Sequence, residues 1–241
     1  MGGIVISEER GVRYLHFGSP WVQGAMRIAR PWALELEYTR ELMMPLLLRR
    51  GRGWPARVLQ VGLGAASITK FLHRHRPEAR LTVVEILPDV VEMARTSFRL
   101  PDESPRLAII VADAVDFMVT ARGRYDLIVV DGFDAKGRAG MLDSAAFYAN
   151  CRAHLAPGGM LAVNLLTRRK SAAASVERLG HAFGEHVLAL PPSEPGNVVA
   201  LSATEDVIAD SPRELGDCAR ALKAETGLDL APTLARLARA R

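Results

Sequence analysis

The amino-acid sequence predicts an α/β fold of the doubly wound type, built on a mostly parallel sheet. From residue 57 onwards, short apolar segments alternate with segments of helical periodicity, which is the order found in parallel sheets with helical crossovers. The strand-sized segments are apolar throughout, as expected of strands that are buried on both faces. The first of them, residues 57–61, runs into a glycine turn and a helix start, which is how a ligand-binding crevice opens in such folds.

The first 52 residues precede this alternation and carry different patterns. Residues 12–17 and 25–29 show partial alternation on either side of a turn signal at 18–20, which predicts a short N-terminal β-hairpin. Residues 32–48 place apolar side chains mainly at helical spacing, which predicts one long helix. We therefore expect an N-terminal hairpin and helix over residues 1–52.

The alternating part of the chain predicts seven strands, of which the last two form a closing hairpin with an antiparallel edge strand. This order is typical of the methyltransferase-like Rossmann sheet, an analogy at the level of fold alone. We expect a nucleotide-binding catalytic domain over residues 53–205 and a peripheral helical tail over 206–241. Asp116 is expected to cap a short helix at 117–120. The expected strands are 57–61, 80–85, 107–111, 126–131, 160–165, 186–190 and 197–202, and the other helices of this domain are 67–75, 88–99, 144–155 and 171–183.

Composition and charge argue against several classes of function. The 241 residues, 49% hydrophobic and 24% charged, fit an ordinary globular domain. The net charge of +4 comes from dispersed clusters without interleaved aromatic side chains, so we expect no nucleic-acid partner. No apolar run reaches the roughly 18 residues of a membrane span, and no secretory signal is visible, so we expect no membrane partner and a cytoplasmic location. Cys151 and Cys218 lack metal or redox spacing and are expected to be free thiols.

The glycine turn after the first strand predicts a nucleotide site. Gly62 and Gly64 allow tight backbone turning and close approach of a ligand to a helix N-terminus. Glu85 ends the next strand, about 20 residues further on, where a carboxylate can accept the two hydroxyls of a ribose. The alternatives are a tight turn without a ligand and a glutamate that caps the helix beginning at Pro88.

Asp113 follows the third strand, where it can meet the exocyclic amine of an adenine. Gln60, before the glycine turn, and Ala114, beside Asp113, complete the predicted nucleotide-binding residues. The sequence has no third glycine in the turn and no phosphate-binding loop of the G-x-x-x-x-G-K-[ST] type. An adenosine joined to a sulfonium therefore fits the pattern better than a nucleoside triphosphate.

Two acids, Asp131 and Asp134, stand beyond the carboxyl end of the fourth strand, where active sites of α/β folds assemble. This segment resembles the spermidine synthase family, whose pattern is tyrosine–aspartate, an apolar strand, D-S-[ST]-D-P and a loop with G-P-A, L-F and F-Y. The resemblance covers roughly residues 56–166, and Tyr38 resembles the tyrosine of a further family segment. The matching residues are Tyr125, Asp126, Asp131, Asp134, Gly137, Ala139, Leu142, Phe147, Tyr148, Cys151, Leu155, Gly158 and Gly159.

The resemblance implies transfer of an aminopropyl group from decarboxylated S-adenosylmethionine to a small-molecule amine such as putrescine. It implies that Asp131 is the base and also borders the cofactor, that Asp134 grips the amine, and that Tyr38 and Gln23 line the amine slot. An aliphatic amine with a pKa around 10 is mostly protonated at neutral pH, so a carboxylate has to hold it and take its proton. The resemblance also implies a homo-oligomer, a dimer or a tetramer, and no metal.

The sequence departs from the family in the glycine loop. Ala65 stands where the family has an aspartate that receives the ammonium group of the decarboxylated cofactor, and Ala66 stands where it has a glycine. Asn164 replaces a glutamine. Because the missing acid also removes repulsion toward a methionine carboxylate, ordinary S-adenosylmethionine is a second possible co-substrate.

Two other functions stay open at this stage. Ala65 favours a small-molecule methyltransferase that uses S-adenosylmethionine. Asp131, Asp134 and Asn164 offer oxygen ligands of the kind that Mg²⁺ prefers, but no second aspartate accompanies Asn164, so no metal is assigned. The loss of the loop aspartate favours a non-catalytic nucleoside-binding relative.

Overall fold

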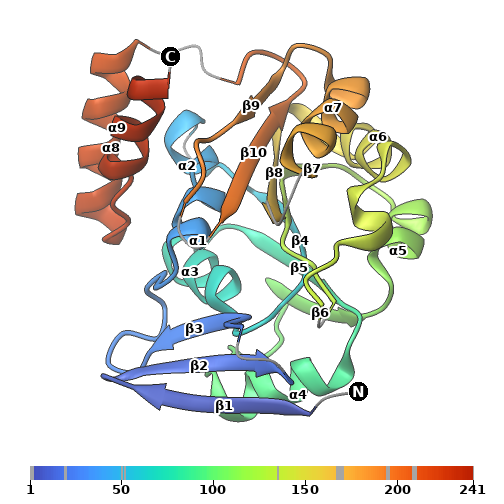
Figure 1. Cartoon of the computed structure of the whole chain (residues 1–241), viewed down its shortest axis with the longest axis vertical. Helices are drawn as coiled ribbons and strands as arrows, with labels where there is room; N and C mark the ends of the chain where they lie inside the picture. Colours follow the sequence, from blue (N-terminus) through green and yellow to red (C-terminus); the bar gives the residue numbers. More distant parts are fainter. Residues whose placement is uncertain are drawn as a thin grey trace.

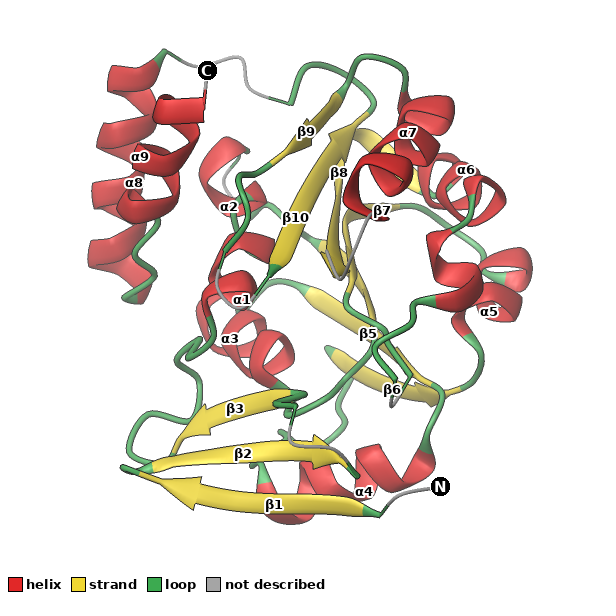
Figure 2. Ribbon diagram, in the orientation of Figure 1, coloured by secondary structure: helices red, strands yellow, loops and turns green. Residues whose placement is uncertain are grey.

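The structure is a computed structural model that describes residues 3–18, 21–49, 51, 53–134, 136–166, 171–193, 196–207 and 211–240. It contains one large and one small sheet, and the small sheet lies at one end of the molecule (Figures 1 and 2). The predicted α/β fold with a mostly parallel seven-stranded sheet is confirmed. In spatial order, the large sheet has β6 (Leu107–Val111), β5 (Arg80–Glu85), β4 (Arg57–Val61), β7 (Tyr125–Val130), β8 (Leu155–Leu166), β10 (Asn197–Ala203) and β9 (Val187–Ala189), and the small sheet has β1 (Ile4–Glu9), β2 (Val12–Phe17) and β3 (Gly24–Arg27).

The predicted closing hairpin is present, but its strands are placed differently from the prediction. Strands β4 to β8 run parallel, whereas β10 pairs antiparallel with both β8 and β9. The antiparallel strand is therefore second from the edge, and the prediction of an antiparallel edge strand was wrong. Every residue of β10 is buried, whereas the three residues of β9 are partly or fully exposed. The longer second strand of the hairpin therefore takes the inner place, where its backbone pairs on both sides.

Helices cover both faces of the large sheet, as the doubly wound prediction requires (Figure 1). Each face has its own cluster of buried apolar side chains, which is how the layers of such a fold hold together. One cluster includes residues of α1 (Glu37–Leu42), α2 (Pro45–Leu48), α3 (Ser67–His75), α4 (Pro88–Ser97), α8 (Pro212–Thr226) and α9 (Ala231–Ala240), and the other includes residues of α5 (Ala114–Thr120), α6 (Ala145–Ala153) and α7 (Ser171–Phe183).

The small sheet contains the predicted hairpin and one strand more. Strands β2 and β3 pair antiparallel, as expected, and β1 pairs with the other edge of β2. The extra strand escaped prediction because Ile4 and Ile6 are followed by Ser7 and two glutamates, so the apolar alternation is too short to stand out. Leu15 and Met26 of this sheet pack against Ala65 in the glycine loop, so the small sheet lies against the predicted nucleotide site.

The single helix predicted over 32–48 is instead two short helices, α1 and α2. Pro45 is the first residue of α2. It has no backbone N–H to continue the hydrogen bonds of α1, and its ring excludes a regular helix through this point. The prediction was wrong because apolar spacing continued across the proline.

The C-terminal tail is helical, as predicted, and the hairpin of α8 and α9 lies at one side of the molecule, where α8 contacts α2 (Figure 1). Leu228, Leu230 and Leu237 are buried in the same cluster as the face of the large sheet. Helix α8 begins at Pro212, with Ser211 and Glu214 forming a capping box. The hairpin of α8 and α9 thus adds buried side chains to this cluster.

Two expectations from composition can be compared with the described residues. Cys151 and Cys218 are free, and burial raises the pKa of the Cys151 thiol. Among the helices in the described part of the chain, none is long and apolar enough to span a membrane.

Candidate active site

The glycine turn after β4 brings two strand ends together. Gly62 has a φ of +87°, and a Cβ atom there would lie 2.2 Å from the backbone oxygen of Asp131. Only glycine allows this conformation and this contact without displacing the end of β7. Gly64 also has a positive φ, +51°. The turn therefore places the N-terminus of α3 next to the strand that precedes the acids.

Gln60 and Glu85 brace this turn from inside. The Gln60 side chain donates to the Gly62 oxygen at 2.7 Å and accepts from the Thr69 hydroxyl at 2.8 Å. Glu85 is 7% exposed, and its carboxylate accepts from the backbone N–H of Leu63 at 2.8 Å. The Leu87 N–H also donates to this carboxylate, at 3.0 Å. A carboxylate has about four acceptor positions, so these two bonds leave Glu85 capacity for ribose hydroxyls. Gln60 is held in a structural role and does not need a ligand to satisfy it.

Asp113 caps α5, and Ala114 is the first residue of that helix. The Asp113 carboxylate accepts from the backbone N–H of Val115 at 2.7 Å, so α5 begins three residues earlier than predicted. The expected cap at Asp116 was wrong because the aspartate before the apolar turn, not the one within it, has the extended backbone that a cap requires.

Ile86 also lies at the carboxyl ends of the parallel strands, beside Glu85, and it was not among the residues predicted from the sequence. Its side chain is 58% exposed directly after Glu85, and the neighbouring Ala112 N–H donates to the Glu85 backbone oxygen. An exposed apolar side chain between two predicted ligand-binding acids, Glu85 and Asp113, offers a face for an aromatic base. The signal in the sequence is an isoleucine placed after the strand instead of within it.

Asp131 follows β7 in a half-buried position between two polar neighbours. Asn164, on β8, donates its Nδ2 hydrogen to the Asp131 carboxylate at 2.8 Å, and the Tyr38 hydroxyl of α1 is a second polar neighbour, which favours the ionised form of Asp131. Burial raises the pKa of Asp131 from 3.8 to about 6, and the hydrogen bonds from Asn164 and Tyr38 oppose that rise. Burial, together with the Asp131 charge, raises the pKa of Tyr38 well above its usual 10. The structure thus brings the predicted residues Tyr38 and Asp131 together.

Asn164 also carries an oxygen that has no partner among the described residues. The side chain is only 4% exposed, and its Oδ1 atom receives no hydrogen bond within the described chain. A buried amide oxygen without a donor is costly unless something donates to it. Because its amide nitrogen already faces Asp131, this oxygen is an unsatisfied acceptor on the side chain that contacts Asp131.

Asp134 lies in a different environment. Its carboxylate accepts from the backbone N–H groups of Lys136 and Arg138 and from the Arg138 guanidinium at 2.7 Å. Burial is the largest single influence and opposes the change, but these hydrogen bonds and the Arg138 charge together lower the pKa of Asp134. In this structure Asp134 organises its own loop instead of joining Asp131.

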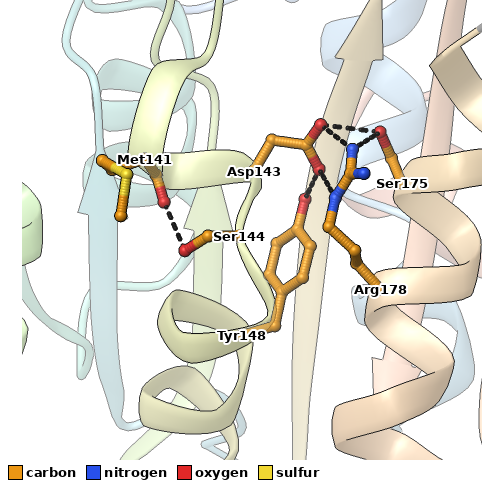
Figure 3. A network of polar contacts seen from close by, with 6 residues as sticks. All are labelled: Met141, Asp143, Ser144, Tyr148, Ser175 and Arg178. Carbon is orange, nitrogen blue, oxygen red and sulfur yellow. Dashed lines mark hydrogen bonds and ion pairs between the residues drawn. The ribbon is translucent and has the colours of Figure 1, made fainter.

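The loop that contains Asp134 is fixed at its far end by a polar network. Figure 3 shows Asp143, at the end of η1 (Gly140–Asp143), between Tyr148 of α6 and Ser175 and Arg178 of α7. The carboxylate accepts from the Tyr148 hydroxyl and the Ser175 hydroxyl, each at 2.8 Å, and forms an ion pair with Arg178. With these donors Asp143 anchors the loop and is not available as a catalytic acid.

Curated relatives match this chain over most of its length. It is 35% identical to the polyamine aminopropyltransferase of Chromobacterium violaceum over 202 residues, which are 84% of this chain and 76% of the relative. It is 36% identical to the polyamine aminopropyltransferase of Neisseria meningitidis serogroup B over 197 residues, 82% of this chain and 74% of the relative. The chain belongs to the polyamine aminopropyltransferase family. The named relatives are transferases.

Solved structures share the fold of this family member. A probable spermidine synthase from Corynebacterium glutamicum superposes with a TM-score of 0.76 at 21% identity, over 91% of this chain and 83% of that one. Human methyltransferase-like protein 13 in complex with SAH gives 0.69 at 23% identity, over 80% and 93%. A family model described as a methyltransferase domain matches residues 58–159. At these identities the structural likeness concerns the fold.

The glycine loop of this family member is closed by apolar packing at Ala65. Ala65 is 2% exposed, and a Cβ atom on Gly24 of β3 would lie 2.6 Å from the Ala65 Cβ atom. The Ser67 hydroxyl donates to the backbone oxygen of Ala25 at 2.9 Å. The small sheet therefore occupies the space where an acid at position 65 would need room and water. Among the described residues, no group of three His, Cys, Asp or Glu side chains is arranged to hold a metal.

Proposed function

We propose that this chain transfers an aminopropyl group from decarboxylated S-adenosylmethionine to a primary amine, with Asp131 as the base. The observation that carries the proposal is the Asp131 carboxylate at the end of β7, with a pKa near 6, with Tyr38 beside it and with the side chain of Asn164, whose buried oxygen has no partner among the described residues, bonded to it. The family relatives supply the reaction class, because they are named polyamine aminopropyltransferases.

The environment of Asp131 suits proton transfer from an amine. At pH 7 to 8 a carboxylate with a pKa near 6 is ionised and still more basic than an ordinary aspartate, which is what a general base near neutrality requires. The ammonium is held by Asp131 and by the Asn164 oxygen and gives its proton to Asp131. The nitrogen lone pair then forms the bond to the methylene carbon as the carbon–sulfur bond breaks, and the sulfur leaves as a neutral thioether.

The nucleoside is proposed to lie across the carboxyl ends of β4, β5 and β6. Gly62 and Gly64 give it room, Glu85 accepts the ribose hydroxyls, and Asp113 and the Ala114 backbone meet the adenine edge. The exposed side chain of Ile86 covers one face of the base. Gln60 acts through Gly62, and the sulfonium end is directed toward Asp131.

Tyr38 and Asp134 complete the proposed amine slot with different roles. Tyr38 donates to Asp131 and fixes its orientation. Asp134 holds the cationic amine only after its bonds to Arg138 are exchanged for bonds to the substrate. Gln23 borders the same region through its backbone, since a Cβ atom on Gly64 would lie 3.4 Å from the Gln23 oxygen.

Ala65 favours a second candidate, methyl transfer from S-adenosylmethionine. The apolar closure at Ala65 leaves the ammonium of a decarboxylated cofactor without a countercharge at that position, and it places no acid against a methionine carboxylate. The same base and the same nucleoside contacts would serve both reactions.

Product analysis with both co-substrates tests these candidates. The purified protein is incubated with decarboxylated S-adenosylmethionine, or with S-adenosylmethionine, and a panel of mono-, di- and triamines. Release of methylthioadenosine with the first supports aminopropyl transfer, and release of S-adenosylhomocysteine with the second supports methyl transfer. Nucleoside binding by calorimetry without either product, for every amine, would mark a non-catalytic relative and overturn the proposal.

We further propose a homo-oligomer, a dimer or a tetramer, that works in the cytoplasm. Val5 and Val22, on and beside the small sheet, are 52% and 41% exposed, and exposed apolar groups of this kind favour an interface between copies. Light scattering after gel filtration tests the assembly, and a monomeric mass would contradict it. Fractionation of the source cells tests the location.

A further inference from the structure

The C-terminal helix α9 reaches the helix that carries Tyr38. Arg236 of α9 forms ion pairs with Glu37 and with Glu41 of α1. Glu41 is completely buried, and the Thr233 hydroxyl also donates to it at 3.4 Å. Burial raises the pKa of Glu41 and the Arg236 charge opposes that rise. A buried carboxylate in this setting depends on its cation, because removing one partner leaves an uncompensated charge.

The residues of helix α1 do not by themselves fix its orientation. It has six residues, no side chain caps its N-terminus, and it ends just before Pro45. A helix this short is not stable on its own. The direction and rotation of α1 are therefore set by the residues that it contacts. Arg236 forms ion pairs with two residues of α1 at once.

The spacing along α1 links that grip to the active site. Glu37 and Glu41 are four residues apart and share the face that meets α9. Tyr38 follows Glu37 by one residue, about 100° around the helix, and its hydroxyl is a neighbour of Asp131 that opposes the rise of the Asp131 pKa. A rotation of α1 that loosened Glu37 and Glu41 would carry the Tyr38 hydroxyl with it.

We propose that Arg236 is a positioning residue for the active site: by holding Glu37 and Glu41 it fixes the rotation of α1 and keeps the Tyr38 hydroxyl on Asp131. This inference rests on the proposed function only for the role of Asp131 as base. It assigns to the C-terminal hairpin a share in setting the base, although α9 contributes no group that touches the reacting atoms.

The charged and polar groups around Asp131 limit what a change at Arg236 can do there. Tyr38 from α1 and Asn164 from β8 face Asp131, while Glu85 is held by backbone N–H groups and Asp134 by the loop that carries it. Tyr38 favours the ionised form of Asp131, so losing its hydrogen bond raises the Asp131 pKa. The direction of the effect is therefore fixed before the experiment.

The test follows the Asp131 titration in four full-length variants. Arg236→Met removes the grip, Tyr38→Phe removes the hydroxyl, the double variant combines them, and Arg239→Met removes an exposed charge from the same helix as the matched control. The readouts are the Asp131 carboxyl titration by ¹³C NMR with labelled aspartate, and the acid limb of the kcat/KM profile against pH. We expect Arg236→Met and Tyr38→Phe each to move the midpoint up by about 0.5 to 1 pH unit, with no further shift in the double variant and none in Arg239→Met.

Two results would overturn the proposal: an unchanged Asp131 midpoint in Arg236→Met, even with a lower Tm, and additive shifts in the double variant. If Arg236→Met does not fold, Arg236→Lys, which keeps the charge but loses the forked grip, takes its place with the same criteria. The NMR titration needs no turnover, so it decides the role of Arg236 even if the transfer reaction itself is disproved.

Discussion

Asp131 and Asp134 lie in neighbouring regions of the chain and have opposite electrostatic settings. Asp131, at the end of β7, is enclosed by β8 and α1, and its pKa is raised to about 6. Asp134, in the loop that follows, has an exposed side chain, and its pKa is lowered by its hydrogen bonds to Arg138 and Lys136. Two acids so close in sequence therefore have different proton affinities.

The difference shows what the end of a strand contributes that a loop does not. Parallel neighbours on both sides and the Gly62 contact half-bury Asp131, and the Asn164 amide donates a hydrogen bond to its carboxylate. A loop carboxylate finds its own backbone N–H groups and solvent, as Asp134 does. A base needs the first setting, and a group that exchanges one cation for another needs the second.

The largest expected effect is a split in activity between the two acids. Asp131→Asn should lower kcat by about 10²- to 10⁴-fold, because a general base contributes that much, whereas Asp134→Asn should cost about tenfold or less, mainly in the KM for the amine. Steady-state kinetics with the best amine found, after thermal melts show both variants folded, measures this. Equal losses in kcat would contradict the division of roles.

The second expected effect concerns stability. The pH dependence of stability that Asp131 contributes has the opposite sign to that of an ordinary carboxyl group, whose pKa is lowered by folding. The folded-state pKa of Asp131 lies above its unfolded value, so its contribution to stability is complete below about pH 4 and is lost as the pH rises through about 6. The Asp131→Asn variant has no group that titrates at this position, so its stability does not fall in this way as the pH rises. We expect the variant to match the wild type near pH 3 and to exceed it by about 1–3 kcal/mol at pH 7.5 in urea unfolding.

Asp134→Asn is the matched control, because the pKa of Asp134 is lowered. Its contribution to stability is present above about pH 4 and is lost as the pH falls, so this variant should be the less stable one at pH 7.5. The comparison fails if Asp131→Asn shows the same pH dependence as the wild type.

Much of the fold could be predicted because it is local. The seven strands, the glycine turn with Gly62, and Glu85 at the end of β5 each follow from apolar runs and from what stands at their ends. The errors came where one residue outweighs a pattern. Pro45 divides an apolar run into α1 and α2, and Asp113, not Asp116, has the backbone that caps α5.

Other parts of the site depend on contacts between distant segments. Asn164 stood in the sequence as a changed family residue, but its bond to Asp131 and its open oxygen follow from the pairing of β8 with β7. The meeting of Arg236 with Glu41 joins residues almost 200 positions apart. Periodicity cannot find such contacts, because no local pattern records which helix will lie beside another.

The smallest expected effect concerns Asp134 and the loop that carries it. Arg138→Ala removes an ion pair whose side chains are 69% and 40% exposed, so it should lower the free energy of unfolding by less than about 1 kcal/mol. The backbone N–H groups of Lys136 and Arg138 still reach Asp134, and about 0.5 M salt should abolish most of the difference in urea unfolding because exposed charges are screened.

The same change, Arg138→Ala, frees Asp134 for a substrate cation, so the KM for a diamine should fall a few-fold while that for a monoamine stays the same. A salt-independent loss well above 1 kcal/mol would mean that the loop depends on this pair for its structure, and that Asp134 is no more exchangeable than Asp131.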